Sequence, residues 1–208
     1  MRGRLIALEG IDGCGKSTQA RLLAKWIGDA SVLTSEPGAT VLGSSLRRLL
    51  LDPELPSLSN RAEALVLAAD RADHVAEVIA PRLAEGRWVV CDRYSGSTFA
   101  YQGYGRGLDL DALRQLVDFA TQGTYADLNV LVDVPFEVAR ARLSGSAADR
   151  FEGLDDGFHR RVRDGYMDIA ASDDSWVVVD GTGTVDDVSR RVSAAVNARL
   201  APLPGGVN

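Results

Sequence analysis

A glycine-rich segment near the start of the chain contains the residue types that hold phosphate groups. Residues 10–17 read Gly-Ile-Asp-Gly-Cys-Gly-Lys-Ser, which fits the pattern G-x-x-x-x-G-K-[ST]. Glycines let such a loop turn its backbone N–H groups toward phosphate oxygens, and the following helix adds its positive N-terminal end. Lys16 would supply a charge to the β- and γ-phosphates, and the Ser17 hydroxyl would ligate Mg²⁺. The alternative is a glycine turn beside a surface lysine. The predicted ATP-binding residues are Gly10, Ile11, Asp12, Gly13, Cys14, Gly15, Lys16, Ser17 and Thr18.

An acidic and a basic residue, Asp92 and Arg93, follow the apolar run Trp88–Cys91. A carboxylate at a strand end beside the phosphate loop can hold Mg²⁺ directly or through water. An arginine there can cancel charge on facing phosphates, which serves a reaction that depends on positioning and electrostatics. The alternative is a buried structural Asp–Arg pair. We predict that Lys16, Asp92 and Arg93 are catalytic, and that Ser17 and Asp92 hold the metal ion.

The elements that would position these residues alternate between strand and helix. The predicted strands cover residues 5–8, 31–34, 88–91, 128–134 and 176–179, and the predicted helices cover 16–27, 41–51, 61–83, 110–121, 136–143, 155–171 and 185–200. This order implies a parallel sheet covered by helices on both faces, with ligands at the carboxyl ends of the strands. We predict an α/β chain with the P-loop NTPase fold and a five-stranded parallel sheet, forming a single domain over residues 1–208.

Composition narrows the classes of partner. The formal net charge is −6, so no excess of positive charge is available to meet a nucleic acid or a membrane surface. No apolar run approaches the roughly 18 residues that span a bilayer, and two cysteines are too few for a disulfide framework. We expect a cytoplasmic protein that binds neither nucleic acid nor membrane. A switch GTPase is excluded, because its guanine-reading motif needs a lysine and the last lysine is Lys25.

Together these segments resemble the thymidylate kinase family. The pieces EGIDGCGKST, TSEPGAT, LAADRADH, DRYSGSTFAYQGYGRG and ADRFE occur in family order, and the resemblance runs from Leu5 to about Gly181. It implies transfer of a phosphoryl group from MgATP to thymidine monophosphate (dTMP), giving ADP and dTDP for dTTP synthesis. It also implies a homodimer, which we expect to pair through the alanine-rich helix 61–83.

The resemblance also implies contacts with the acceptor. Asp12 would hold the 3′-hydroxyl of the sugar, and Arg47, rather than its neighbour Arg48, would bind the monophosphate. Arg71 would contact the thymine ring, and Tyr101 would crowd the 2′ position and so favour deoxyribose. The full set of predicted substrate-binding residues is Asp12, Glu36, Pro37, Arg47, Leu67, Arg71, Arg93, Ser97, Thr98, Tyr101 and Gln102. The alternatives are structural: Asp12 would cap the loop, Arg47 would be a solvated side chain, and residues 97–102 would form an ordinary loop-to-helix transition.

One position departs from the family pattern. The family usually places a phenylalanine four residues before the arginine of LAADRADH, where it stacks on thymine, and this chain has Leu67. Aliphatic contact would replace stacking, or Leu67 would belong to the core. A kinase for another nucleoside monophosphate or for a deoxynucleoside is therefore the alternative function. A nucleotide-binding regulatory module without catalysis is the alternative of another class.

A small polar stretch, residues 144–153, is predicted to form a short lid over the ATP phosphates. Members of the family place an arginine either in the phosphate loop or in the lid. The variable loop position is Cys14, and no arginine lies between Arg4 and Arg21. The resemblance therefore implies the lid-arginine type, with Arg150 as a fourth catalytic residue and Arg142 as the second choice.

Overall fold

The protein is built around one sheet of five parallel strands. The computed structural model describes residues 2–52, 54–143, 151 and 154–201. The strands lie in the order β2-β3-β1-β4-β5, with bounds β1 Leu5–Glu9, β2 Ser31–Ser35, β3 Trp88–Asp92, β4 Leu128–Asp133 and β5 Trp176–Asp180. The predicted α/β fold with a five-stranded parallel sheet is confirmed, and each predicted strand lies within one residue of its observed bounds.

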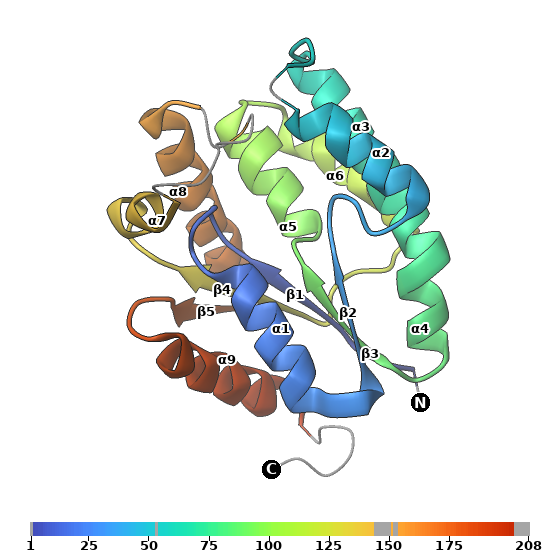
Figure 1. Ribbon diagram of the computed structural model, residues 1–208. Coiled ribbons are helices and arrows are strands. Elements are labelled where there is room, and N and C mark those ends of the chain that lie inside the picture. The colour runs from blue at the N-terminus through green and yellow to red at the C-terminus, as the bar shows by residue number, and fades with distance from the viewer. Residues whose placement is uncertain (1, 53, 144–150, 152–153, 202–208) are drawn as a thin grey trace.

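Helices surround the sheet (Figure 1). Their bounds are α1 Lys16–Ile27, α2 Val41–Leu51, α3 Asn60–His74, α4 Ala80–Ala84, α5 Ser95–Ser97, α6 Leu110–Thr121, α7 Phe136–Leu143, α8 Asp156–Ser172 and α9 Val185–Leu200, with a 3₁₀ turn η1 Gly28–Ala30 and two π-helical segments, η2 Val75–Ile79 and η3 Thr98–Gly105. Among the described residues, no helix combines the length and the apolar character that a bilayer crossing needs.

The apolar run of β1 follows from burial on both faces. Side chains alternate across a strand, and every residue of β1 is buried. Ile6 and Leu8 belong to a core that includes the apolar residues of α1 and α9, whereas Leu5 and Ala7 pack with those of η2 and α4. The helices α1 and α9 contact each other on their face of the sheet, as Figure 1 shows.

Two predicted segments need correction. The predicted helix 61–83 consists of α3, the π-helical segment η2 and α4, joined without leaving helical backbone angles. It begins at Asn60 because the side chain of Ser59 accepts a hydrogen bond from the backbone N–H of Ala62 and so caps the helix. The second correction is α5 with η3, since no helix was expected over residues 95–105.

Candidate active site

The phosphate loop connects β1 to α1 and needs its glycines. Gly10, Gly13 and Gly15 all have positive φ angles, of 142°, 80° and 97°. A Cβ atom at Gly10 would lie 2.7 Å from the carbonyl oxygen of Val132 in β4, and one at Gly13 would lie 2.3 Å from that of Ala139 in α7. The loop therefore packs directly on the backbone of two other elements, and its shape depends on residues without a side chain.

A pocket of about 900 Å³ opens at this loop. It is lined by Gly13, Cys14, Gly15, Lys16, Ser17, Thr18, Gln19, Arg142, Gly181, Gly183, Thr184, Val185 and Val188. Six of the nine predicted ATP-binding residues thus line one pocket, whereas Gly10, Ile11 and Asp12 do not. Arg142 crosses the pocket, because its guanidinium donates to the carbonyl oxygens of Cys14 and Gly181, both at 3.1 Å. We refer to this pocket as the loop pocket.

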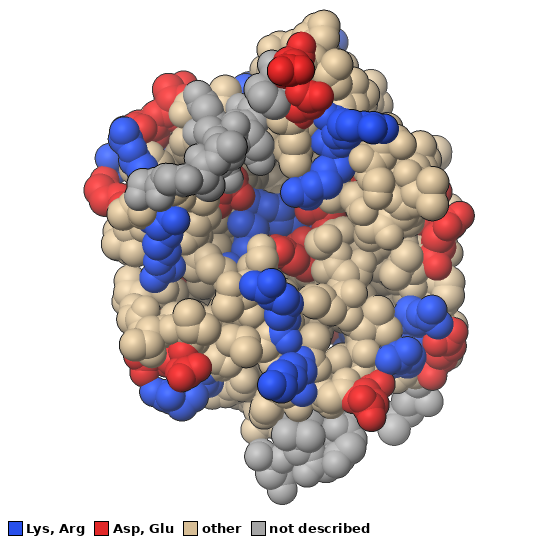
Figure 2. All heavy atoms as spheres, in the orientation of Figure 1, with Lys and Arg blue, Asp and Glu red and all other residues tan. Residues whose placement is uncertain are grey.

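A second pocket lies beside the loop pocket. Figure 2 shows a hollow near the centre of this face, with basic and acidic side chains in it. The lining residues are Asp12, Glu36, Pro37, Arg47, Leu50, Leu51, Leu67, Arg71, Arg93, Tyr94, Ser97, Thr98, Tyr101, Gln102 and Phe151. The structure thus brings together all eleven predicted substrate-binding residues, and Arg47 lines the pocket whereas Arg48 does not. We refer to it as the acceptor pocket.

Arg93 lines the acceptor pocket next to the phosphate loop. It follows β3 with a φ of 69°, a left-handed conformation that is unfavourable for a residue with a side chain. Its Nη1 atom donates to the carbonyl oxygen of Gly10 at 3.1 Å and to the hydroxyls of Ser97 and Tyr166 at 3.0 and 3.2 Å. Its Nη2 atom donates to the hydroxyl of Tyr101 at 3.0 Å and forms a short ion pair with a carboxylate of the phosphate loop. The surroundings therefore fix the guanidinium on both sides.

That carboxylate belongs to Asp12, which links the two pockets. Lys16 lines the loop pocket, and its Nζ atom lies 3.3 Å from Oδ1 of Asp12, which lines the acceptor pocket. The hydroxyl of Tyr101 donates to Oδ2 of Asp12 at 2.7 Å. Burial alone would raise the pKa of Asp12, but the charges of Arg93 and Lys16 outweigh it and hold this pKa below its usual value. Asp12 is therefore an ionised hydrogen-bond acceptor between two cations.

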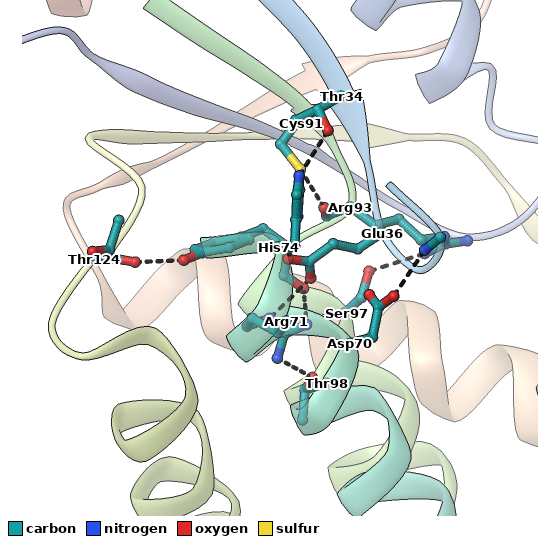
Figure 3. Close-up of polar contacts among 12 residues, drawn as sticks. Thr34, Glu36, Asp70, Arg71, His74, Cys91, Arg93, Ser97, Thr98 and Thr124 are labelled. Atoms are coloured by element: carbon teal, nitrogen blue, oxygen red, sulfur yellow. Dashed lines mark hydrogen bonds and ion pairs between the residues drawn. The ribbon is translucent and has the colours of Figure 1, made fainter. Parts of the chain in front are cut away.

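Arg71 lines the acceptor pocket, and Figure 3 shows its side chain among Glu36, His74 and Thr98. Its Nε atom donates to Oε2 of Glu36 at 2.9 Å, its Nη1 atom to Oγ1 of Thr98 at 2.8 Å and its Nη2 atom to the carbonyl oxygen of Tyr94 at 3.1 Å. Glu36 and Arg71 are both buried, at 5 % and 3 % exposure. Near the opening, Arg47 donates to the carbonyl oxygen of Pro37 at 2.9 Å. Glu36 thus binds Arg71 deep in the pocket, and the adjacent Pro37 binds Arg47 at its rim.

Asp92 has a carboxylate oxygen that suits a cation. It ends β3, and its buried Oδ1 atom has no hydrogen-bond partner among the described residues. A carboxylate oxygen without a protein partner can ligate a divalent ion. Asp92 itself lines neither pocket. The described residues contain no group of three or more His, Cys, Asp or Glu side chains that could hold a metal.

Two functional neighbours of Arg93 were missed by the sequence analysis. Glu9 is fully buried and accepts hydrogen bonds from the hydroxyl of Ser97 at 2.7 Å, the backbone N–H of Tyr94 at 2.9 Å and the hydroxyl of Tyr166 at 3.0 Å. Burial raises the pKa of Glu9, although these hydrogen bonds and the charge of Arg93 oppose the shift. A charged residue that ends an apolar strand must be partnered. That rule could have identified Glu9, but nothing in the sequence pointed to Tyr166.

The predicted lid falls largely outside the part of the chain that the structure describes. Arg150 and the rest of residues 144–153 lie outside the described residues, apart from Phe151. The side chain of Phe151 lines the acceptor pocket, and its ring centre lies 6.0 Å from that of Tyr101. The fourth catalytic assignment, Arg150, therefore stays a prediction.

Comparison with known proteins agrees with this arrangement. The family model for thymidylate kinase matches residues 8–192. The chain is 45 % identical to thymidylate kinase of Nostoc sp. strain PCC 7120, over 96 % of this chain and 98 % of that protein. It is also 45 % identical to thymidylate kinase of Carboxydothermus hydrogenoformans, over 90 % of this chain and 94 % of the relative.

A solved structure supports the same assignment. The crystal structure of thymidylate kinase from Ehrlichia chaffeensis superposes with a TM-score of 0.79 at 32 % sequence identity, over 94 % of this chain and 100 % of that one. Sequence and fold thus agree over nearly the whole chain, and the chain belongs to the thymidylate kinase family.

Proposed function

We propose that this enzyme transfers the γ-phosphoryl group of ATP to dTMP, giving ADP and dTDP, and that it works in the cytoplasm. The observation that carries the proposal is the contact between the two pockets. Lys16 of the loop pocket and Arg93 of the acceptor pocket both bind Asp12, so donor and acceptor phosphates would meet at one cluster of fixed charges. Phosphoryl transfer depends mainly on positioning and on charge stabilisation, which such a cluster supplies.

The donor side would be held by the phosphate loop. Backbone N–H groups of residues 13–18 and the N-terminus of α1 would bind the ATP phosphates, with Lys16 on the β- and γ-phosphates. Ser17 and Asp92 are the residues we assign to a Mg²⁺ ion, which would neutralise phosphate charge. Arg142, which already spans the loop pocket, would border the nucleotide, and Arg150 would supply the remaining positive charge from the lid.

On the acceptor side, Arg93 would bind the phosphate of dTMP. Five protein oxygens hold its guanidinium in place, and the one carboxylate among them, that of Asp12, is shared with Lys16. Asp12, kept ionised by Arg93 and Lys16, would accept a hydrogen bond from the 3′-hydroxyl of the sugar. Arg47 at the rim of the pocket would add a second charge to the acceptor phosphate. Asp12 would thus place the 3′-hydroxyl of dTMP, and Arg93 and Arg47 would place its phosphate. The three side chains come from different parts of the fold.

The base would lie against Arg71 and the start of η3. The Nε2 atom of Gln102 donates to Oε1 of Glu63 at 2.9 Å, which orients the amide and presents its oxygen as an acceptor for the N–H of the pyrimidine. Arg71, bound to Glu36 and Thr98, would contact a ring carbonyl. Apolar contact with the ring would come from lining side chains that include Leu50, Leu51, Leu67 and Phe151.

We also propose a homodimer that pairs through α3 and η2. Their solvent-facing side carries Leu65, Ala69, Ala72 and Ala76, at the spacing of one helix face, and Leu65 is 59 % exposed. An apolar stripe of mostly small residues allows two helices to approach closely. A second copy of the chain is the occupant that we expect.

One experiment tests the catalytic proposal directly. ADP release would be measured with MgATP and each of dTMP, dUMP, the ribose form of TMP, AMP and CMP, for wild type, Arg93→Ala and the control Arg114→Ala. We expect dTMP to be preferred and Arg93→Ala to lose at least about 100-fold in kcat. Arg114 pairs with Asp111 on the exposed face of α6, so its variant should match wild type.

The result can also favour the alternative acceptor. Leu67, where the family usually has phenylalanine, would weaken the recognition of thymine. If another nucleoside monophosphate or a free deoxynucleoside were preferred over dTMP, the assignment of the base would be wrong, although the phosphate chemistry would stand. ATP binding without ADP formation on any acceptor would instead indicate a regulatory module.

A further inference from the structure

His74 is buried directly behind the acceptor pocket. It lies in the last turn of α3, three residues after Arg71, and its side chain is 0 % exposed. Its Nε2 atom lies 2.7 Å from Oγ1 of Thr34 in β2, and its Nδ1 atom lies 2.9 Å from Oε1 of Glu36 (Figure 3). Neither His74 nor Thr34 lines the pocket. Both ring nitrogens are therefore used inside the protein, and none contacts a ligand directly.

Glu36 connects this histidine to the pocket wall. Its Oε1 atom accepts from His74, while its Oε2 atom accepts from Nε of Arg71 at 2.9 Å. The other donors of Arg71 go to the hydroxyl of Thr98 in η3 and to the carbonyl oxygen of Tyr94, which precedes α5. A continuous set of hydrogen bonds thus runs from Thr34 in β2 through His74, Glu36 and Arg71 to Thr98 in η3.

The energetics explain why the histidine matters. Glu36 and Arg71 are a buried ion pair, and such a pair is costly unless its remaining polar atoms are hydrogen-bonded. The second oxygen of Glu36 obtains its donor from Nδ1–H of His74. Bonding is complete with a neutral ring, because Nε2 can accept from the hydroxyl of Thr34, which fixes both the tautomer and the ring plane. Removal of the imidazole would leave a buried carboxylate oxygen without a donor.

We propose that His74, oriented by Thr34, is a positioning residue that fixes Glu36 and, through it, Arg71 for recognition of the acceptor base. This inference rests on the proposed function, in which Arg71 contacts the base of dTMP. The cluster around Arg93 is built from other side chains, namely Asp12, Ser97, Tyr101 and Tyr166. Loss of His74 should therefore affect the binding of the acceptor more than the binding of ATP or the rate of transfer.

Two substitutions separate hydrogen bonding from packing. His74→Phe keeps a ring of similar size but has no donor, whereas His74→Asn places an amide N–H near the position of Nδ1–H. We expect KM for dTMP to rise about tenfold or more in His74→Phe, which matches the cost of an unpaired buried group, with KM for ATP and kcat nearly unchanged. His74→Asn should recover most of the affinity for dTMP.

Three controls make the outcome decisive. His159→Phe replaces the other buried histidine, which stacks on Phe136 away from the acceptor pocket, and should leave KM for dTMP unchanged. In an Arg71→Lys background, His74→Phe should have little additional effect on KM for dTMP, because the histidine acts through the arginine. Thr34→Val, which preserves shape, should raise the same KM to a smaller degree and serves as the test if His74→Phe does not fold.

The overturning results are distinct from failure of the proposed function. An unchanged KM for dTMP in folded His74→Phe, or an equal loss in kcat and in both KM values, would show that His74 has only a structural role. If wild type itself did not use dTMP, the proposed function would fail. The same variants would then be compared on the acceptor that wild type does use, where a selective rise in its KM would still support the positioning role.

Discussion

At the residue scale, Asp70 shows how burial and a neighbouring charge act on one carboxyl group beside the acceptor pocket. Its Oδ1 atom accepts from the backbone N–H of Gly38 at 2.9 Å, while its buried Oδ2 atom has no hydrogen-bond partner among the described residues. Burial, followed by the negative charge of Glu36, raises the pKa of Asp70 to about 6, although the hydrogen bond from Gly38 and the charge of Arg71 oppose the shift. The folded protein therefore holds this proton more tightly than the unfolded chain does.

This shift gives a pH dependence with a definite sign. The ordinary pKa of the group is 3.8, so its stabilising contribution is complete below that pH and is lost as the pH rises through about 6. Asp70→Asn keeps the acceptor for Gly38 and cannot ionise. We expect the free energy of unfolding of the variant, relative to wild type, to increase between about pH 4 and pH 8 in urea titrations. The exposed Asp111→Asn is the control, and a difference independent of pH would contradict the shift.

Single residues were predictable where a local pattern carries the chemistry. Lys16 and Ser17 follow from a contiguous motif, and Arg93 follows from its place after a buried strand. Glu9 and Tyr166 were not found, because the hydrogen bond between them joins positions 157 residues apart. No local pattern encodes such a pair, and only the packing of α8 against the site brings it together.

At the scale of elements, η3 depends on close contact with α8. A Cβ atom at Gly105 of η3 would lie 2.6 Å from the ring of Phe158, and one at Gly165 of α8 would lie 2.4 Å from Cγ of Tyr104. Glycines have poor helix propensity, so residues 98–105 gave no helical signal in the sequence. They are helical here because the two segments pack tightly. The strands β1, β3 and β4, in contrast, were predictable because burial on both faces of the sheet requires apolar runs.

Gly165→Ala tests this packing. Alanine has the higher helix propensity by about 1 kcal/mol, whereas overpacking of a rigid contact costs about 1–3 kcal/mol. The clash is with ring and Cβ atoms of Tyr104, which cannot swing away as a flexible side-chain end would, so we expect net destabilisation in urea titrations. KM for dTMP should also rise, since η3 carries Thr98, Tyr101 and Gln102. Ala171→Ser, at an exposed position of α8, is the control. If Gly165→Ala were as stable as wild type, the contact between α8 and η3 would not be tight.

At the scale of the whole molecule, the site follows from the topology. In a parallel sheet the carboxyl ends of the strands meet at one edge, so the segments after β1, β2 and β3 had to lie together once the strands were known. The eleven acceptor residues were implied by the family resemblance, and the topology brings the widely separated motifs that carry them to one pocket. The shape of the acceptor pocket could not be predicted, because it depends on how α2, α3 and η3 pack together, and no local pattern fixes that.

The proposed homodimer can be tested at two exposed apolar residues. Leu65 is 59 % exposed on the α3 and η2 stripe that we propose as the dimer interface, and Phe119 on the adjoining α6 is 83 % exposed. In a two-fold interface, both protomers bury their own copy of each such residue. A charge introduced there is therefore costly twice. We expect wild type to have the mass of a dimer at micromolar concentration in light scattering and Leu65→Glu to have that of a monomer. Val178→Glu changes a 45 % exposed residue of β5, the edge strand opposite β2 in the sheet, and should stay dimeric. Dissociation in both variants, or in neither, would place the interface elsewhere.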